Sequence, residues 1–277
     1  MYKPKKSLGQ NFLKSTIALK KIVEAGEISL EDVILEIGPG KGALTEKLLS
    51  AISTSYKEAD GEKSGYVIAI EKDHELFEFL KEKFKKEILE NKLILIKEDI
   101  LNFNTKNIFK YKIIANIPYN ITGAILKKFL TEENQPELMV LMVQNEVAKR
   151  ITGINPTSPR LRRVKESILS ISVKAYGEPK MIMKVPARYF SPSPKVDSAV
   201  ISIKNISKKI FSENKITEEK FWEILHAGFA HKRKKLSSNL KKYIGPSYVN
   251  ILKNKRAEEL TLTDWINLVK SIDIHKK

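Results

Sequence analysis

The sequence contains no cysteine, which excludes disulfide bonds, zinc sites built on thiolates and a cysteine nucleophile. Histidine is almost as scarce, and His74, His226, His231 and His275 show no metal-ligand spacing with carboxylates, so we predict no bound metal. No apolar run approaches the length that spans a membrane, and no long apolar stretch follows the charged N-terminus. We therefore expect a soluble, cytoplasmic protein that does not contact membranes.

Acidic residues are also in short supply, because 33 Asp and Glu stand against 50 Lys and Arg in 277 residues. The resulting net charge of +17 favours a polyanionic partner such as RNA, DNA or an anionic surface. Lysine predominates over arginine, so a lysine-rich proteome would account for part of the excess. Hydrophobic residues make up 42% of the chain, which is enough for a large α/β domain and a small partner domain.

The first half of the chain alternates apolar runs with segments of helical spacing. The runs predict strands at 33–37, 65–70, 93–96, 111–115 and 138–143. The spacing predicts helices over 43–50, 74–89 and 121–130. This alternation indicates a doubly wound sheet with helices on both faces.

The remainder divides into loops, two further strand-like segments and a helical end. Residues 53–64 and 153–159 are expected as loops, and residues 166–173 and 196–203 have strand character because they are rich in β-branched residues. Residues 206–219 are polar and lysine-rich, typical of a linker. We therefore predict an α/β domain over residues 1–205 and a small all-α, basic domain over residues 206–277.

The segment Asn116-Ile117-Pro118-Tyr119 follows the expected strand 111–115 and carries the most specific chemistry in the chain. The side-chain oxygen of Asn116 and a fixed backbone carbonyl can accept both hydrogens of an exocyclic base amine. Those bonds favour a nitrogen with a localised lone pair, and more so in the transition state. Pro118 restricts the backbone that aims the carbonyl, and Tyr119 offers a face for base stacking. The pattern indicates methyl transfer to a base amine, although a plain turn after a strand explains these residues equally well.

A glycine turn, residues 38–42, follows the first expected strand. Gly38 and Gly40 let the backbone approach a ligand closely, but the turn matches neither a P-loop nor G-x-G-x-x-G and could bind NAD, a flavin or nothing. Glu71 ends the second strand, where an acid can accept from ribose hydroxyls, and Asp99 with the Ile100 backbone follows the third, where it can accept from an adenine amine. Either acid alone is more simply a surface charge. Polar groups at successive strand ends nevertheless indicate one nucleotide-like site.

Long, ordered segments of the sequence resemble the KsgA-type rRNA adenine N6,N6-dimethyltransferases. The resemblance covers nearly the whole chain and rests on residues 7–13 (SLGQNFL), 34–45 (ILEIGPGKGALT), 69–73 (AIEKD), 98–100 (EDI), 116–122 (NIPYNIT), 144–150 (QNEVAKR) and 190–200 (FSPSPKVDSAV). It implies a Rossmann-like methyltransferase sheet with a small all-α C-terminal domain. It also implies S-adenosylmethionine as cofactor and 16S rRNA, within the 30S subunit or its precursor, as partner of a monomer.

The resemblance assigns roles residue by residue. The cofactor site would comprise Asn11, Leu13, Gly38, Gly40, Glu71, Asp99, Ile100 and Asn116. In it Gly38 would approach the methionine end, Glu71 the ribose and Asp99 the adenine. The catalytic group would comprise Asn116, Pro118, Tyr119 and Phe190, with Tyr119 and Phe190 enclosing the flipped adenine. Without the family, Phe190 would read as an aromatic that caps the core.

RNA contacts are expected from basic residues in two regions. The resemblance and the charge pattern together suggest Lys149, Arg150, Arg160, Arg162, Arg163, Lys232, Arg233, Lys234 and Lys235. Residues 232–235 would form a phosphate-binding helix, or simply a solvated helix face. The chain departs from the family in its longer 53–64 insertion and in residues 154–166, which lack the usual K-x-Y-G. The second segment keeps the basic character that the family shows there.

The implied reaction is dimethylation of N6 on two adjacent adenosines in the 3′-terminal hairpin of 16S rRNA, with a role in 30S biogenesis. The transfer would be direct and in line, with no covalent enzyme intermediate. Two rivals remain open at this point. The Erm-type 23S rRNA adenine methyltransferases share Q-N-F and N-I-P-Y, although Pro39 and residues 229–240 favour the KsgA type. A non-catalytic ribosome-assembly factor would use only the basic surface.

Overall fold

The computed structural model describes residues 2–5, 8–53, 65–153, 165–245, 252 and 254–274. The chain forms two compact units: residues 1–148 with 178–206, and residues 149–177 with 207–277. The second unit thus takes in a segment from the middle of the chain. A compact unit need not fold on its own, so the division into two domains at residue 205 stays a prediction. The predicted loops at 53–64 and 153–159 lie almost wholly outside the described residues.

The first unit is built on a seven-stranded sheet in the order β4-β3-β2-β5-β6-β9-β7. The strands are β2 (Val33–Ile37), β3 (Tyr66–Glu71), β4 (Leu93–Lys97), β5 (Tyr111–Asn116), β6 (Leu138–Gln144), β7 (Glu178–Val185) and β9 (Ser198–Lys204). β2 to β6 pair in parallel, whereas β9 is antiparallel to both β6 and β7. The five strands predicted in the first half and the strand at 196–203 are confirmed. The sequence reading missed β7.

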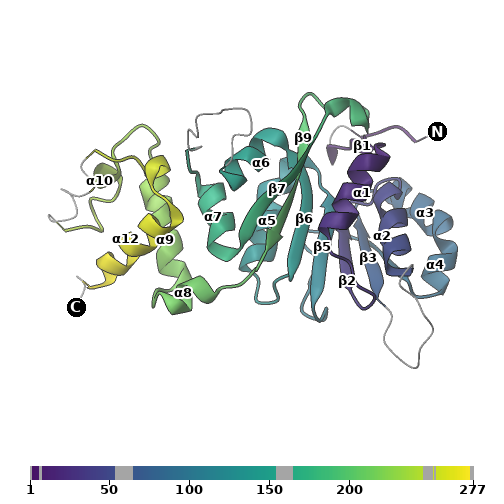
Figure 1. Cartoon of the computed structure of the whole chain (residues 1–277), viewed down its shortest axis with the longest axis horizontal. Coiled ribbons are helices and arrows are strands. Elements are labelled where there is room, and N and C mark those ends of the chain that lie inside the picture. Colours follow the sequence, from purple (N-terminus) through teal and green to yellow (C-terminus); the bar gives the residue numbers. More distant parts are fainter. Residues whose placement is uncertain are drawn as a thin grey trace. The chain divides into compact units, whose positions relative to one another are not determined.

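Helices cover both faces of this sheet (Figure 1). Those of the first unit are α1 (Thr16–Ala25), α2 (Ala43–Ser53), α3 (His74–Lys83), α4 (Lys85–Leu89) and α5 (Thr122–Thr131). The single helix predicted over 74–89 is wrong, because the chain leaves helical geometry at Phe84 (φ −109°, ψ 26°). The Phe84 ring is buried against Gly42, where an added Cβ would lie 2.5 Å from it. Packing against the glycine turn thus accompanies the break between α3 and α4.

One continuous apolar core lies between the sheet and the layer formed by α1 and α2. It joins Ile22 of α1 and Leu48 of α2 to inward residues of the strands, among them Ile34, Ile114 and Val140. The neighbouring strand residues are just as buried but lie outside this cluster, because successive side chains of a strand point to opposite faces. Burial on both faces explains why the parallel strands are almost continuously apolar.

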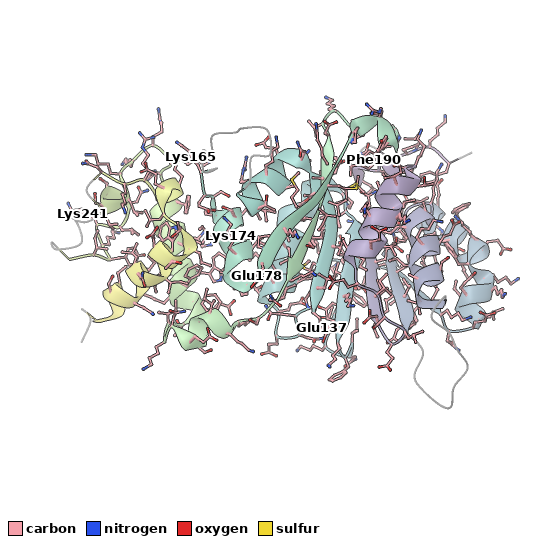
Figure 2. The ribbon with its side chains drawn as sticks, in the orientation of Figure 1. Glu137, Lys165, Lys174, Glu178, Phe190 and Lys241 are labelled. Carbon is pink, nitrogen blue, oxygen red and sulfur yellow. The ribbon has the colours of Figure 1, made fainter. Side chains whose placement is uncertain are left out.

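The second unit is helical. Its helices are α7 (Ile168–Tyr176), α8 (Lys209–Glu213), α9 (Glu218–Phe229), α10 (Leu236–Asn239) and α12 (Leu262–Ile274), and α6 (Asn145–Thr152) runs into it from β6. Aromatic pairs fill its core, as where the Phe229 ring stacks on the buried Trp265. The ammonium of Lys174 pairs with Glu166 at 2.6 Å, and Lys165 pairs with Glu258 (Figure 2).

Two predictions in the second unit are wrong. Residues 166–173 were expected as a strand, but α7 occupies most of them. Ser167 caps this helix by accepting from the Ser170 amide, and burial of Ile171 and Val173 outweighs the low helix propensity of β-branched residues. The predicted linker 206–219 contains the short helix α8. Its Phe211 is buried, so this lysine-rich stretch is part of the packed unit.

A separate two-stranded sheet ties the N-terminal segment to the first unit. β1 (Phe12–Leu13) pairs antiparallel with β8 (Phe190–Ser191). The Lys14 amide donates to the Tyr189 carbonyl at 2.8 Å, which continues the pairing. This small sheet holds residues 8–14 beside the ends of the parallel strands, where the candidate site lies.

Candidate functional site

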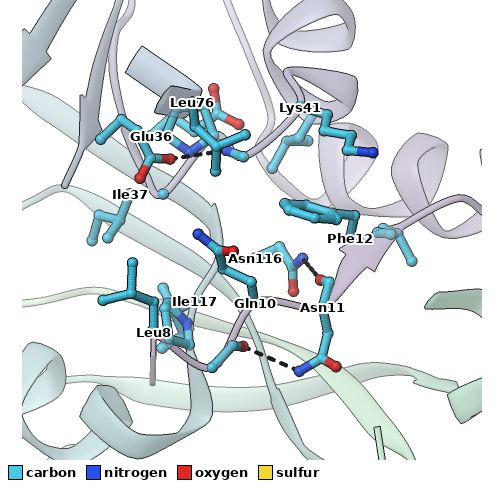
Figure 3. Close-up of a pocket in the computed structure, with 18 of the residues that line it drawn as sticks. Leu8, Gln10, Asn11, Phe12, Glu36, Ile37, Lys41, Leu76, Asn116 and Ile117 are labelled. Atoms are coloured by element: carbon cyan, nitrogen blue, oxygen red, sulfur yellow. Dashed lines mark hydrogen bonds between the residues drawn. The ribbon is translucent and has the colours of Figure 1, made fainter. Parts of the chain in front are cut away.

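A cavity of about 640 Å³ opens at the carboxyl ends of the parallel strands (Figure 3). Gly38 and Gly40 after β2, Glu71 at the end of β3, Asp99 after β4 and Asn116 at the end of β5 all line it. Its size lies in the range of nucleotide-sized ligand pockets. The structure therefore brings together in one cavity the polar groups that the sequence placed at successive strand ends.

The glycine turn exposes its backbone to this cavity. Gly38 and Gly40 have φ of +64° and +61°, a region that favours glycine. A Cβ on Gly38 would meet nothing within 4 Å, so open space adjoins the backbone there. A Cβ on Gly40 would lie 3.0 Å from the Phe12 ring, which packs against the turn. The turn is thus open to a ligand at Gly38 and covered by the N-terminal segment at Gly40.

The carboxylate of Glu71 is fixed by backbone amides. It accepts from the Asp73 amide at 2.8 Å and from the Gly40 amide at 3.2 Å, and the residue is 6% exposed. Burial raises the pKa of Glu71, although these two amides counteract the shift. Each carboxylate oxygen has a second lone pair, so Glu71 can hold the glycine turn and accept from ligand hydroxyls at the same time.

Asp99 is more exposed than Glu71. It accepts from Lys72 at 2.7 Å through one oxygen and from the Leu101 amide at 3.0 Å through the other. The Lys72 ammonium is the main reason that the pKa of Asp99 lies below its usual range. Ile100, which lines the cavity beside it, is buried. Asp99 is therefore ionised and able to accept a further hydrogen bond.

Glu36 is a buried acid that the sequence reading did not assign to the site. It lines the cavity, is 1% exposed and accepts from the Thr45 hydroxyl at 2.7 Å. Burial raises its pKa to about 8, the Thr45 hydrogen bond opposes the shift, and the nearby Glu71 adds to it. A charged residue inside the apolar run of β2 was the signal that could have singled it out.

We expect Glu36→Gln to change how stability depends on pH. The pKa of Glu36 rises from 4.5 to about 8 on folding, so between those values the folded protein binds one more proton than the unfolded chain. As the pH rises from about 4.5 to about 8, the free energy of unfolding of the wild type should fall relative to that of Glu36→Gln, by up to about 1.4 kcal/mol per pH unit. Urea unfolding of both proteins at pH 5, 6.5 and 8 measures the difference. Parallel stability profiles would contradict a buried protonated Glu36.

Asn116 is oriented by the N-terminal segment. Its side-chain nitrogen donates to the Asn11 carbonyl at 3.3 Å, and the Asn11 side chain donates in turn to the Gly9 carbonyl at 3.1 Å (Figure 3). With the amide nitrogen engaged, the Asn116 oxygen is left to accept from another group. Pro118 adopts φ −60°, ψ 132°, and Ile117 before it is buried. The backbone and the side chain of this segment are therefore both restrained.

The N-terminal segment is held over the cavity by a cluster of contacts to Asp73. We call the described residues 2–5 and 8–14 the N-terminal strap. Asp73 accepts from the Tyr2 hydroxyl at 3.0 Å and from Gln10 at 3.3 Å, and it pairs with Lys5 at 2.9 Å. Burial works against ionisation of Asp73, but Lys5 and the Leu76 amide outweigh it and lower the pKa. The sequence did not predict this cluster, because Asp73 lies 63 or more residues along the chain from each of its partners in the strap.

Replacing Asp73 with serine should release the strap without unfolding α3. Serine can still cap α3 at this position, as Asp73 does for the amides of Glu75 and Leu76, but it cannot pair with Lys5. We expect amide hydrogens of residues 8–14 to exchange at least about tenfold faster, because local opening then costs less free energy. Hydrogen exchange with mass spectrometry measures this, with the peptide that covers α3 as internal control. Unchanged exchange in residues 8–14 would show that Asp73 does not secure the strap.

Of two expected site residues, Leu13 lies in the cavity wall and Phe190 lies behind it. Leu13 lines the cavity and is 6% exposed. Phe190 (Figure 2) is 3% exposed, belongs to the apolar core and does not line the cavity, whereas its neighbour Ser191 does. This buried position agrees with the alternative in which Phe190 is an aromatic that caps the core. A stacking role for Phe190 stays a prediction and would require the ring to leave the core.

The expected RNA-binding residues are placed only in part. Residues 160, 162 and 163 lie outside the described residues. Lys149 and Arg150 lie on α6, where Arg150 is exposed. Lys232, Arg233, Lys234 and Lys235 are all exposed, but they form a turn between α9 and α10, so the expected basic helix is wrong. The turn presents the same four charges to solvent.

Neither a metal centre nor a membrane span is found in the part of the chain that the structure describes. Within residues 2–5, 8–53, 65–153, 165–245, 252 and 254–274, no three His, Asp or Glu side chains are grouped so as to hold a metal ion. No helix in the same ranges is both long and apolar enough to cross a bilayer.

The sheet order, with a ligand-sized cavity at the carboxyl ends of the parallel strands, defines a Rossmann-like fold of the kind found in S-adenosylmethionine-dependent methyltransferases. A family model described as "Ribosomal RNA adenine dimethylase" matches residues 1–273. The chain belongs to the ribosomal RNA adenine dimethylase family, as its sequence motifs indicated.

Individual relatives agree with this assignment. The chain is 37% identical to ribosomal RNA small subunit methyltransferase A of Dehalococcoides mccartyi over 96% of this chain and 87% of that protein. It is 34% identical to the protein of the same name in Rippkaea orientalis over 98% and 100%. By structure it is similar to a dimethyladenosine transferase from Plasmodium falciparum, with TM-score 0.72, 24% identity and coverage of 96% and 98%. It is also similar to the 23S rRNA methyltransferase ErmE, with TM-score 0.69, 22% identity and coverage of 95% and 100%.

Proposed function

We propose that this protein transfers methyl groups from S-adenosylmethionine to N6 of adenosine in small-subunit rRNA, twice on each of two adjacent adenosines of the 3′-terminal hairpin. The observation that carries the proposal is the oriented Asn116 amide on the wall of a cavity that also holds Glu71 and Asp99. Family membership supports adenine in ribosomal RNA as the target. The hairpin and the pair of adenosines rest on the resemblance of the sequence motifs.

The residues of the cavity fit S-adenosylmethionine. The open backbone at Gly38 suits its methionine end, the Glu71 carboxylate suits two ribose hydroxyls, and Asp99 suits an adenine amine. Asn11, Leu13, Gly40 and Ile100 complete the wall. When bound, the cofactor supplies an electrophilic methyl group on a positively charged sulfur.

The chain's own residues would prepare the target amine for attack. The Asn116 oxygen and the backbone carbonyl beside Pro118 would accept its two N–H hydrogens and favour a localised lone pair on N6. Because the Asn11 carbonyl already engages the other end of the Asn116 amide, little reorganisation is needed during the reaction. Tyr119 would support the flipped base by stacking. No strong base is required, since the proton can leave the amine after attack.

The small subunit is favoured over the large one by the curated relatives. Those cited above carry the name ribosomal RNA small subunit methyltransferase A, at 34% or more identity over nearly the full chain. The fold alone does not separate the alternatives, because ErmE has almost the same TM-score as the dimethyladenosine transferase. We propose 16S rRNA within the 30S subunit or its precursor as the partner of a cytoplasmic monomer. Exposed Lys and Arg residues 232–235 would contact its phosphates.

Transfer of a tritiated methyl group to isolated ribosomal particles tests the choice of substrate. Particles from cells that lack their own small-subunit dimethyltransferase provide unmodified targets. We expect label in 30S particles and background levels in 50S particles. Label confined to 50S particles would instead support the Erm-like alternative.

Titration calorimetry with S-adenosylmethionine separates an enzyme from a non-catalytic assembly factor. We expect saturable binding at one site per chain, because Glu71, Asp99 and the Gly38 backbone are all available to a ligand. A protein that binds 30S particles but not S-adenosylmethionine would favour the assembly factor.

A further inference from the structure

We propose that Ser198 is a positioning residue that fixes the Tyr119 ring as the platform for the target adenine. The Tyr119 hydroxyl lies 2.5 Å from the Ser198 hydroxyl, and either can donate. This inference rests on the proposed function, in which Tyr119 stacks on the flipped base. It adds that the position of the Tyr119 ring is set by Ser198, a residue that does not line the cavity.

Ser198 is a rigid anchor because the sheet holds it from both sides. It is the first residue of β9, pairs with Gln144 of β6 and Val185 of β7, and is fully buried. Asp197 before it secures the turn further, since its carbonyl accepts from the Asn145 amide at 2.9 Å and its carboxylate pairs with Lys184 at 2.7 Å. With this backbone fixed, the Ser198 hydroxyl can move only by rotation about χ1.

Tyr119, by contrast, stands where the sheet ends. It follows Pro118 and opens a single 3-10 turn, Tyr119–Ile121, beyond β5. Tyr119 lines the cavity, and its hydroxyl contacts Ser198 of β9. Burial raises the pKa of Tyr119, although the bond to Ser198 opposes the shift, so the hydroxyl stays protonated at neutral pH and can donate.

The bond would matter most for the second methyl transfer. A stacked base is held by the face of the ring, so tilting the ring moves N6 relative to the methyl donor. The monomethylated amine is bulkier and has one N–H left for Asn116 or the backbone to accept. The position of the monomethylated amine therefore depends more on the Tyr119 ring than that of the unmodified amine does. Loss of the bond to Ser198 should slow the second transfer more than the first.

The chain offers a matched control for Ser198. Ser202 lies on the same strand and the same face, four residues along, and is 1% exposed. Its hydroxyl has no hydrogen-bond partner within the described residues. Serine-to-alanine replacement at either position removes one buried hydroxyl from β9, but only at 198 does it remove a bond to Tyr119.

The test is a double-mutant cycle on Ser198→Ala and Tyr119→Phe, with Ser202→Ala as control and unmodified 30S particles as substrate. We expect each single change to lower kcat/KM for the particle about tenfold, as is usual when one partner of a buried hydrogen bond is removed. The double variant should be no worse than either single variant, because all three lack the same bond. The affinity for S-adenosylmethionine should stay within about twofold of wild type, and Ser202→Ala should match wild type. The ratio of monomethyl- to dimethyladenosine should rise in the single and double variants alike.

The inference is overturned if Ser198→Ala retains wild-type kcat/KM and product ratio, if the two losses multiply in the double variant, or if Ser202→Ala loses as much as Ser198→Ala. Thermal unfolding midpoints of all four variants show whether they fold. Tyr119→Phe probes the same bond from the other side should Ser198→Ala be unstable. A wild-type protein that methylates no adenosine would remove the proposed function and this inference together, whereas an active wild type with a fully active Ser198→Ala removes the inference alone.

Discussion

Asn116→Ala should abolish most methyl transfer while leaving the cofactor site nearly intact. Removing one preorganised hydrogen-bond partner of a reacting group typically costs about 10²–10³ in kcat. The side chain sits at the end of β5 with its nitrogen on the Asn11 carbonyl, so its oxygen is in place before the substrate arrives. We expect the dissociation constant for S-adenosylmethionine to change less than about tenfold, because Glu71 and Asp99 remain. Single-turnover methyl transfer and calorimetry on the same preparation measure the two effects.

Asn107→Ala is the matched control for this change. It removes the same side chain from an exposed position in the loop before β5, remote from the carboxyl end of that strand. It should transfer methyl groups like the wild type. Near-normal turnover of Asn116→Ala would overturn the role assigned to that amide, and an equal loss of cofactor affinity would make Asn116 a binding residue only.

Glu71→Ala should have the second largest effect, this time on cofactor binding. The change removes the proposed acceptor for the ribose and frees the Gly40 amide that the carboxylate holds at 3.2 Å. Charge-assisted hydrogen bonds are worth about 1.5–3 kcal/mol each, so loss of two, one to each ribose hydroxyl, predicts at least about a hundredfold weaker binding of S-adenosylmethionine. Calorimetry measures this directly, and the thermal shift that the cofactor produces in the wild type should vanish at the same concentration.

Two companion variants define what the Glu71 result means. Glu78→Ala removes a half-exposed carboxylate from α3 of the same unit and should bind the cofactor like the wild type. Glu71→Gln keeps an acceptor oxygen without the charge and should bind with intermediate affinity. If Glu71→Ala binds as tightly as Glu78→Ala, the cofactor does not contact Glu71, and the ribose assignment fails.

The parallel part of the fold follows from the sequence because it is governed by local rules. Residues 138–143 are buried on both faces and therefore appear as an uninterrupted apolar stretch, and residues 33–37 are interrupted only by Glu36. Where tertiary packing outweighs local preference, the sequence reading fails. Residues 166–173 look like a strand because Ile and Val are frequent, yet the Ser167 cap and packing against α9 and α12 place most of them in the helix α7. Phe84 interrupts a helix that spacing alone would continue.

The candidate site could be predicted to the extent that its residues sit at strand ends. Gly38, Glu71, Asp99 and Asn116 follow directly from the strand order, because parallel strands end at one edge of the sheet. Contacts between distant segments could not be found in this way. The Asp73 cluster and the bond between Tyr119 and Ser198 join residues at least 63 positions apart, and single residues carry no signal for such pairing. For Phe190 the residue type indicated a core position and the family motif indicated base stacking, and the ring lies in the core.

The most direct test of the proposed function is to identify the methylated nucleoside itself. Unmodified 30S particles are incubated with the protein and methyl-labelled S-adenosylmethionine, and the rRNA is then digested to nucleosides and analysed by mass spectrometry. The proposed function predicts N6,N6-dimethyladenosine as the end product, two residues per 16S rRNA, both in the 3′-terminal hairpin and absent with Asn116→Ala. Label on any other base or position, or none while the cofactor binds normally, would contradict it.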